Sequence, residues 1–252
     1  MCKRAVLEGY EVTSLSRRGN VDKEDKNSAS LLSIDYRRGD ARQKETVANI
    51  LQEGGYTGIV HCIGLLFDDA SGLGRFNVFV SGSGSVPDDN STYDTITRLT
   101  AFHAIEAAID YATEKQQQQQ DDDDDVSSLP FVFTSAAEAG WPDVSLGPQI
   151  EQYLAPEWLK RYLAAKRSVE EKLLASSPAL RPVIVRPSLI YSLDRPSSYV
   201  PVGAFFVGNQ VGLPFVDRPV TVQALSCAIV RAIDQETVSG VQRYNEIDEL
   251  SQ

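Results

Sequence analysis

Residues that build metal sites or disulfide frameworks are scarce in this chain of 252 residues. It has three cysteines, Cys2, Cys62 and Cys227, which are far apart and show no CxxC spacing, and only two histidines. An odd number of dispersed cysteines argues against a disulfide framework and is typical of a reducing compartment. His61 lies in an apolar run, where a core histidine is the expected role, so the sequence predicts no metal site.

Long apolar runs and an excess of positive charge are also missing. No stretch reaches the ~18–20 apolar residues that a membrane-spanning helix needs, and the first residues lack the apolar segment of a signal peptide. The formal net charge is −11, five of the negative charges form the run Asp121 to Asp125, and there is no broad basic stripe. This distribution argues against nucleic-acid binding. The composition predicts one globular domain over residues 1–252.

Short apolar runs alternate with helical patterns along the chain. Strands that are buried on both faces are typical of parallel sheets, and such alternation is typical of a doubly wound α/β domain. The sequence therefore predicts a Rossmann-like parallel sheet with right-handed crossovers. The expected strands cover residues 12–16, 31–35, 58–63, 131–135 and 182–186, and the expected helices cover about residues 42–52, 91–115 and 156–176.

A dinucleotide-binding domain normally begins with a strand, a glycine-rich turn and a helix, and the first two are missing here. Residues 1–10 read as the last turns of that helix, and residues 11–17 read as the second strand. The missing strand is central in the strand order 3-2-1-4-5-6, so its absence predicts unpaired edges on the strands at residues 12–16 and 58–63. We expect the sequence to be N-terminally incomplete.

Two segments have a biased composition. Residues 116–128 contain a glutamine run and an aspartate run, which cannot bury a core, so we expect a mobile loop that is a tolerated insertion or a docking tail. Residues 81–85 are rich in glycine but lack the GxGxxG spacing, and we interpret them as a surface loop.

The C-terminal part, residues 201–252, is expected to form a small substrate lobe. Residues 201–207 and 213–216 are apolar and are punctuated by glycine and proline. Such segments suit the wall of a pocket for a hydrophobic substrate, a docking face, or a plain hydrophobic core. A helix is expected to follow residues 219–225 and to continue to about Ile233.

Tyr162 and Lys166 are four residues apart on an expected helix, which places them on one face as a ready-made pair for proton transfer. A structural role is the alternative, because Tyr162 belongs to an apolar stripe with Leu159, Val169 and Leu173. Lys166 interrupts that stripe, which favours a functional role for the pair.

An ordered set of short motifs resembles the atypical short-chain dehydrogenase/reductases. Within that family, the chain is most similar to the group that contains the NAD(P)H-binding accessory subunit of respiratory complex I and a mitochondrial protein associated with coenzyme Q synthesis, with related plastid proteins. The motifs lie at residues 12–18, 39–40, 61–64, 134–137, 162–166 and 185–191.

The resemblance implies roles for single residues. Tyr162 would be the catalytic acid/base, Lys166 would lower the pKa of the Tyr162 phenol and hold the ribose hydroxyls, and Ser135 would orient the substrate oxygen. Two positions depart from the family pattern: Thr97 stands where many active members have asparagine, and Ser188 replaces a usual glycine. These departures weaken the case for catalysis.

The resemblance also implies a set of cofactor-binding residues. Arg17 and Arg18 follow the second strand, where basic side chains accept a 2′-phosphate, so NADP(H) is favoured over NAD(H), although arginines there can also be simply solvated. Asp40 would contact the adenine, Gly64 would allow a close backbone approach, and Pro187 belongs to the cofactor-binding motif. Ordinary turn chemistry is the alternative for Asp40 and Gly64.

Two functions are consistent with these residues. The first is an NAD(P)H-binding protein with an accessory or assembly role in organellar quinone or respiratory metabolism, in a membrane-associated complex. The organelle would be the mitochondrion, or alternatively the plastid. The second is an active NADP(H)-dependent oxidoreductase that acts on a hydrophobic carbonyl or quinone-related compound, with Tyr162 as the acid/base.

Overall fold

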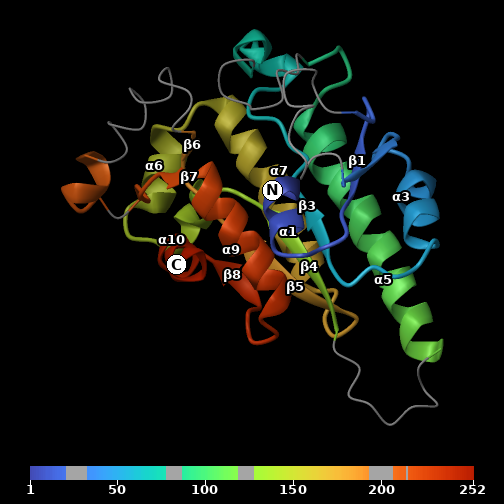
Figure 1. Cartoon of the computed structure of the whole chain (residues 1–252). Helices are drawn as coiled ribbons and strands as arrows, with labels where there is room; N and C mark the ends of the chain where they lie inside the picture. Colours follow the sequence, from blue (N-terminus) through green and yellow to red (C-terminus); the bar gives the residue numbers. More distant parts are fainter. Residues whose placement is uncertain (21–32, 78–86, 119–127, 193–206, 214) are drawn as a thin grey trace.

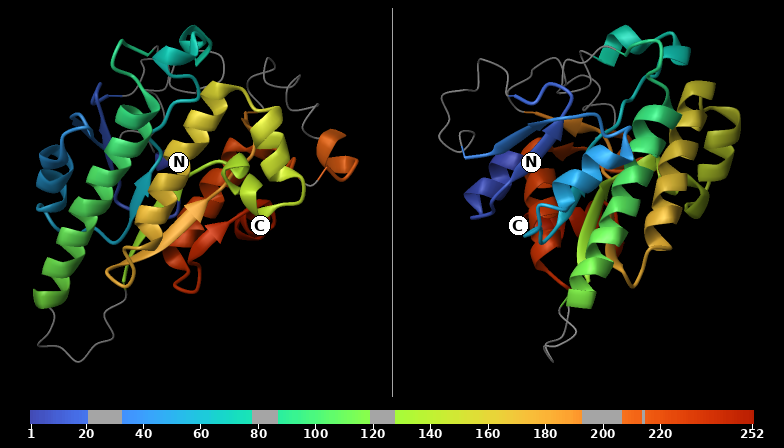
Figure 2. Two further views of the ribbon diagram at one scale, coloured as in Figure 1. Left: turned by 180° about the vertical axis from the view of Figure 1, so that it is seen from behind. Right: turned by 90° about the vertical axis from the view of Figure 1, so that its right-hand side faces the viewer.

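The computed structural model describes residues 1–20, 33–77, 87–118, 128–192, 207–213 and 215–252. The chain forms an α/β structure in which helices cover both faces of a parallel sheet (Figures 1 and 2). This arrangement confirms the predicted fold class. The sheet has the order β3 (Ile59–His61), β4 (Leu129–Thr134), β5 (Leu180–Val185) and β8 (Gly240–Gln242).

The centre of the sheet is formed by β4 and β5. Every residue of β5 is buried, as are the first five of the six residues of β4. Their register pairs Val132 with Val183 and Phe133 with Ile184. Because side chains alternate along a strand, Phe133 and Val132 point to opposite faces, and each face can build its own core.

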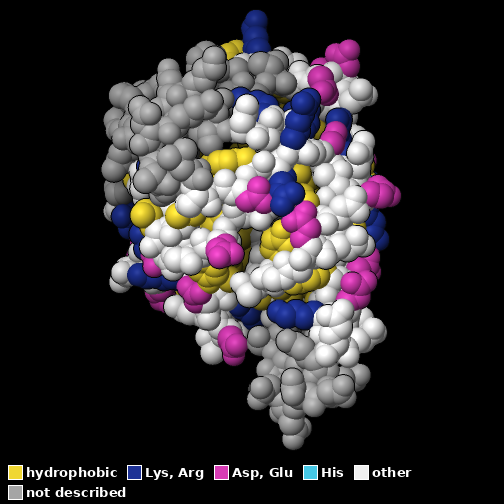
Figure 3. Space-filling model, turned by 45° about the vertical axis from the view of Figure 1, so that its right-hand side comes forward, with side chains coloured by type: hydrophobic (Ala, Val, Ile, Leu, Met, Phe, Trp, Pro, Cys, Tyr) yellow, Lys and Arg dark blue, Asp and Glu magenta, His cyan; other side chains and the backbone are white. Residues whose placement is uncertain are grey.

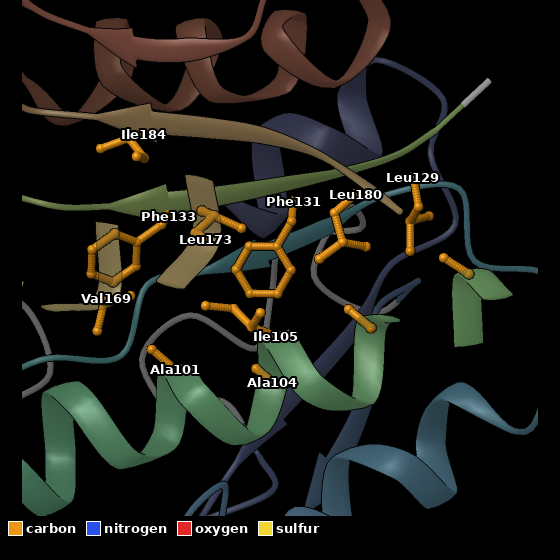
Figure 4. Close-up of a cluster of buried hydrophobic side chains, with 12 residues drawn as sticks. Ala101, Ala104, Ile105, Leu129, Phe131, Phe133, Val169, Leu173, Leu180 and Ile184 are labelled. Atoms are coloured by element: carbon orange, nitrogen blue, oxygen red, sulfur yellow. The ribbon is translucent and has the colours of Figure 1, made fainter. Parts of the chain in front are cut away.

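The first core lies between the sheet and the helices α5 (Thr100–Gln118) and α7 (Glu157–Leu174). Figure 4 shows the rings of Phe131 and Phe133 directed from β4 towards α5. Small side chains such as Ala101 and Ala104 leave room for these rings, so α5 packs closely against the sheet.

The second core lies on the opposite face, under α9 (Val222–Asp234) and α10 (Tyr244–Ser251). Thr221 caps the start of α9, because its Oγ1 accepts a hydrogen bond of 3.0 Å from the backbone N–H of Ala224. At the other end of α9, the buried guanidinium of Arg181 donates to the carbonyl oxygens of Ala232 and Ile233. The short helix α1 (Cys2–Leu7) packs against α9 on this face.

Two further strands, β1 (Thr13–Ser16) and β2 (Asp35–Arg38), form a separate parallel pair. Within the described part of the chain, β1 is not hydrogen-bonded to β3. The predicted unpaired edges at these two strands are therefore present in the structure. Another parallel pair is formed by β6 (Ile190–Tyr191) and β7 (Val220–Thr221), and α3 (Lys44–Leu51) packs against α5.

Several boundaries differ from the sequence prediction. The strand expected at residues 31–35 is instead β2, which starts at Asp35. Because β2 consists mainly of polar residues, the pattern of apolar runs did not predict it. The helix expected at residues 91–115 begins as the π-helix η4 (Tyr93–Leu99) and continues as α5 through Gln118. The first glutamines of the expected loop are therefore helical, because glutamine is a good helix former.

Some elements were not expected, and some predictions fall outside the described residues. The unexpected ones are β6, β7, β8, α10, α6 (Gly147–Tyr153) and the 3₁₀-helices η2 (Asp69–Ser71), η3 (Gly74–Phe76) and η5 (Ala137–Asp143). Residues 81–85, 119–127 and 201–206, about which the sequence made predictions, lie outside the described residues.

Within the described ranges, no helix is both long and apolar enough to cross a membrane. On the face drawn in Figure 3, hydrophobic side chains are visible in the hollowed centre, with acidic and basic side chains interspersed around it. Charges of both signs therefore share this face.

Candidate functional site

The carboxyl ends of β1, β2 and β3 open into one pocket with a volume of about 510 Å³. In a parallel sheet, the carboxyl ends of the strands lie at one edge, which is where ligands of doubly wound domains bind. Arg17 and Arg18 after β1, Asp40 after β2 and Gly64 after β3 all line this pocket. The structure thus brings together four of the residues that the resemblance implied for cofactor binding.

Ion pairs already engage the charged groups of this pocket. Arg42 forms a two-pronged contact with Asp40, with Nη2 2.6 Å from Oδ2 and Nε 3.0 Å from Oδ1. Hydrogen bonding by Arg42 is the main reason why the pKa of Asp40 is lowered. Arg17 is half exposed, and its Nη1 lies 3.6 Å from Asp88 Oδ2, which makes a weak pair. An adenine contact by Asp40 would therefore compete with Arg42.

Lys166 reaches from α7 to the carboxyl ends of β3 and β4. Its Nζ donates a hydrogen bond of 2.7 Å to the carbonyl oxygen of Thr134, and the residue is only 4% exposed. A Cβ placed on Gly64 would lie 3.4 Å from this Nζ, so the lysine and the glycine are neighbours. Burial lowers the pKa of Lys166 from 10.5 to about 8.

Tyr162 lies one turn before Lys166 on α7, and neither residue is among those that line the pocket. Its ring meets the ring of Tyr93 edge-on at 5.6 Å, and Lys166 Nζ lies 5.7 Å from the centre of the Tyr162 ring. The pKa of Tyr162 is raised, first by burial and then by the charges of Glu138 and Tyr93. This rise is opposite to the lowering by Lys166 that the resemblance implied, and burial is its largest cause.

Ser135 follows β4 directly, and its backbone N–H donates to the Val185 carbonyl at 2.8 Å. The residue is 5% exposed, and its Oγ is buried with no hydrogen-bond partner among the described residues. The hydroxyls of Thr97 and Ser188 are buried without a partner in the same way. Buried polar atoms are normally satisfied, so these hydroxyls point to water or a ligand.

Two more of the predicted residues have structural partners. The carbonyl of Pro187 accepts a hydrogen bond of 2.9 Å from the backbone N–H of Ala137, which fixes the start of η5. His61 is buried, as expected for a core histidine, and its Nε2 lies 3.1 Å from Thr100 Oγ1. Burial and the nearby Lys166 lower the pKa of His61 to about 3, so this ring is neutral at physiological pH.

Sequence reasoning missed Arg42 and Glu138. Arg42 could have been found from its spacing, because it stands two residues after Asp40 in the turn that follows β2. Glu138 lies in η5, which the sequence did not predict, so nothing in the pattern placed it near Tyr162. Across the described ranges, no cluster of three metal-ligating side chains is present.

Comparisons with known proteins agree with the fold. No protein-family model matches the chain. A curated relative, "MIOREX complex component 2" of Saccharomyces cerevisiae, is 22% identical over 98% of this chain and 93% of its own length. The chain is thus similar in sequence to a protein whose name describes it as a component of a complex.

Solved structures share the architecture at low identity. A short-chain dehydrogenase/reductase family oxidoreductase from Burkholderia thailandensis matches with a TM-score of 0.58 and 13% identity, covering 96% of this chain and 83% of that one. ElxO with NADP bound matches with a TM-score of 0.54 and 14% sequence identity, and the match covers 96% of this chain and 91% of ElxO. The enzyme WbmH of Bordetella bronchiseptica in complex with NAD⁺ matches with a TM-score of 0.54 and 14% sequence identity, and the match covers 96% of this chain and 69% of WbmH. The chain therefore has the Rossmann fold of short-chain dehydrogenase/reductases.

Proposed function

We propose that this protein binds NAD(P)H in the pocket at the carboxyl ends of β1, β2 and β3. The observation that carries this proposal is the placement of Lys166, whose buried ammonium group lies beside Gly64 and has one acceptor, the Thr134 carbonyl, among the described residues. An ammonium group has three N–H donors, and leaving donors unused in a buried site is costly. The ribose hydroxyls of a nicotinamide nucleotide would supply the missing acceptors.

The residues present fit such a cofactor in its ribose and adenosine parts. Gly64 leaves the space that a side chain would fill next to Lys166, and Arg17 and Arg18 line the same pocket as Gly64. Among the described residues, no glycine-rich turn is present that would hold the pyrophosphate. The bound group would supply a hydride; the residues would position it.

NADP(H) is favoured over NAD(H) by the charges at the pocket mouth. A 2′-phosphate needs cationic side chains, whereas a carboxylate that accepts from the 2′-hydroxyl favours NAD. The residue directly after β1, where a carboxylate would select NAD, is Arg17, and it makes just a weak surface pair with Asp88. A phosphate could displace that weak pair and be bound by Arg17.

We assign the protein an accessory or assembly role rather than a metabolic turnover of its own. Thr97 stands where many active members of the resembled family have asparagine, and Ser188 replaces a usual glycine. The resemblance to complex I and coenzyme Q proteins supports a mitochondrial location for this role, with the plastid as the alternative. The similarity to a MIOREX complex component supports a protein complex as the partner.

Oxidoreductase activity is the second candidate, and the unpartnered hydroxyl of Ser135 favours it. This buried Oγ has no reason to stay unsatisfied in a purely structural role. A carbonyl oxygen of a substrate could accept from Ser135 and from the protonated phenol of Tyr162, which is the acid that reduction requires. Tyr162→Phe should then abolish NADPH oxidation without a change in NADPH affinity.

Titration with NADPH, followed by its fluorescence, tests the binding proposal. Lys166→Met should weaken binding by at least tenfold, because it removes the donor to the ribose. Lys160→Met is the matched control, since Lys160 lies on the same helix but pairs with Glu157 at the surface. Equal affinities of the wild type and both variants, or no binding by the wild type at any pH, would exclude the proposed site.

Cys62 provides an independent footprint of the same pocket. It is exposed and lines the pocket, whereas Cys227 is buried. In a Cys2→Ser background, a maleimide should label Cys62, and NADPH should slow this labelling because it would cover the pocket. Labelling that is insensitive to saturating NADPH would place the nucleotide elsewhere.

A further inference from the structure

The turn formed by residues 87–91 brings a carboxylate to the part of the pocket that holds Arg17. Pro87 and Ser91 line this pocket together with Arg17, which follows β1 directly. Between them in the turn stands Asp88, whose Oδ2 lies 3.6 Å from Arg17 Nη1. Two segments that are far apart in the sequence thus place opposite charges side by side at the pocket.

The carboxylate of Asp88 is held in place by its own turn. Its Oδ1 accepts hydrogen bonds from the Ser91 hydroxyl at 2.8 Å and from the backbone N–H of Asn90 at 3.2 Å. The backbone N–H of Asp88 donates to Ser91 Oγ at 3.1 Å, and Ser91 is buried. Many surface ion pairs lose energy to the ordering of their side chains, whereas this turn already orders the carboxylate.

A second ion pair, between Arg42 and Asp40, lines the same pocket and is more tightly bound. Arg42 holds Asp40 through two hydrogen bonds, and its Nη2 lies 2.6 Å from Oδ2. A two-pronged contact of this kind is strong, so a ligand anion does not readily displace it. Of these two arginines, Arg17 is therefore the one whose carboxylate partner an anion can replace.

A phosphate group binds Arg17 better than Asp88 does. A phosphate monoester carries about −1.5 to −2 charges at neutral pH, and it can accept two parallel hydrogen bonds of about 2.7–2.9 Å from a guanidinium. Asp88 offers one oxygen at 3.6 Å. When a phosphate takes Arg17, the Asp88 carboxylate stays nearby because its own turn holds it. Two groups of like charge then face each other, and Asp88 opposes the phosphate.

We propose that Asp88 sets the preference of the pocket between NADPH and NADH. This inference rests on the proposed cofactor site, because of these two nucleotides only NADPH carries the 2′-phosphate that would meet Arg17. Repulsion by Asp88 weakens the binding of NADPH and leaves the binding of NADH unchanged, so this carboxylate lowers the preference for NADPH. A repulsive group that acts on one ligand alone is a general way to tune specificity.

Titrations of the wild type and of Asp88→Asn with NADPH and with NADH, followed by nucleotide fluorescence, test this inference. Asparagine keeps an oxygen that can accept from Ser91 and Asn90, so the turn is preserved while the charge is lost. Asp88→Asn should bind NADPH about 3- to 10-fold more tightly, a modest gain because both side chains are half exposed, and it should bind NADH as the wild type does. The gain should shrink at high salt.

Three more variants assign the gain to the charge of Asp88. Asp89→Asn is the matched control, because Asp89 is the exposed neighbour of Asp88 and its replacement removes the same charge. Asp88→Ala removes the charge without supplying an amide donor, so it should shift NADPH binding in the same direction. In an Arg17→Met background, Asp88→Asn should no longer favour NADPH, because the phosphate then lacks its partner beside residue 88.

The possible results separate this inference from the cofactor proposal. An unchanged ratio of NADPH to NADH affinity in Asp88→Asn, or the same gain in Asp89→Asn, would overturn the role of Asp88 and leave the cofactor site intact. A gain in Asp88→Asn that is absent in Asp88→Ala would come from the new amide and would overturn it as well. If the wild type binds neither nucleotide, the cofactor site is refuted and this inference fails with it.

Discussion

Replacement of Lys166 by methionine should stabilise the protein while it removes nucleotide binding. Lys166 is 4% exposed, and its ammonium group has one hydrogen-bond acceptor among the described residues, the Thr134 carbonyl at 2.7 Å. Methionine has a similar volume and no charge, so it avoids the desolvation of the ammonium group. Functional groups of this kind are often retained at a cost in stability.

The magnitude follows from the pKa of Lys166. Burial lowers this pKa from 10.5 to about 8, which corresponds to roughly 3 kcal/mol of destabilisation at neutral pH. The substitution also removes the hydrogen bond to Thr134. This loss costs about 1 to 2 kcal/mol, which offsets part of the gain in stability. We therefore expect Lys166→Met to raise the free energy of unfolding by about 1 to 2 kcal/mol, or the melting temperature by roughly 2 to 8 °C.

The difference in stability between Lys166→Met and the wild type should depend on pH. Below pH 8 the lysine is charged in both states, and the full cost of burying the charge is present. As the pH rises from about 8 to 10.5, the folded state releases the proton before the unfolded state does, so the stability of the wild type rises. The advantage of Lys166→Met should therefore shrink over this window.

Urea unfolding of both proteins at pH 7 and pH 10, followed by circular dichroism, measures the two differences. The account predicts a higher midpoint for Lys166→Met at pH 7 and a smaller difference at pH 10. A variant that is less stable than the wild type at pH 7, or a difference that does not change with pH, would show that Lys166 is not a desolvated ammonium group.

Three further substitutions test the packing around the site. Glu170→Gln removes the charged partner of the buried Arg186, and the Glu170 side chain is itself only 5% exposed. In urea unfolding, this change should lower the free energy of unfolding by about 3 kcal/mol or more. The control Glu157→Gln at the surface should lower it by under about 0.5 kcal/mol. Leu173→Ala, at 0% exposure, should lower the free energy of unfolding by about 2 to 5 kcal/mol, and Leu174→Ala next to it, 44% exposed, by far less; equal losses would contradict the described core. Leu146→Gly should raise the melting temperature, because Leu146 has a φ of 64° that costs a leucine roughly 1 kcal/mol; an unchanged or lower value would argue against that conformation.

The fold could be predicted because its strongest signals are local. Runs such as residues 131–135 and 182–186 are apolar on both faces, and burial of β4 and β5 on both sides explains why. The helix at residues 156–176 was visible from its stripe. The polar strand β2 and the short helices η5 and α6 carry no such periodicity, and tertiary contacts form them instead.

The site was predictable only where motifs mark it. The pocket unites Arg17, Arg18, Asp40 and Gly64 as the motif order suggested, because all of them follow parallel strands. The rise in the pKa of Tyr162 could not be predicted from the sequence. It depends on burial and on the charge of Glu138, which lies in the unpredicted helix η5. The catalytic and cofactor roles of these residues stay predictions.

The most direct test is a crystal structure of the protein with NADPH. The account predicts the nicotinamide ribose hydroxyls within hydrogen-bond distance of Lys166 Nζ, next to Gly64, and the adenosine half near Arg17 and Arg18. Density for the nucleotide in any other place, or a nicotinamide ribose that does not contact Lys166, would contradict the central claim.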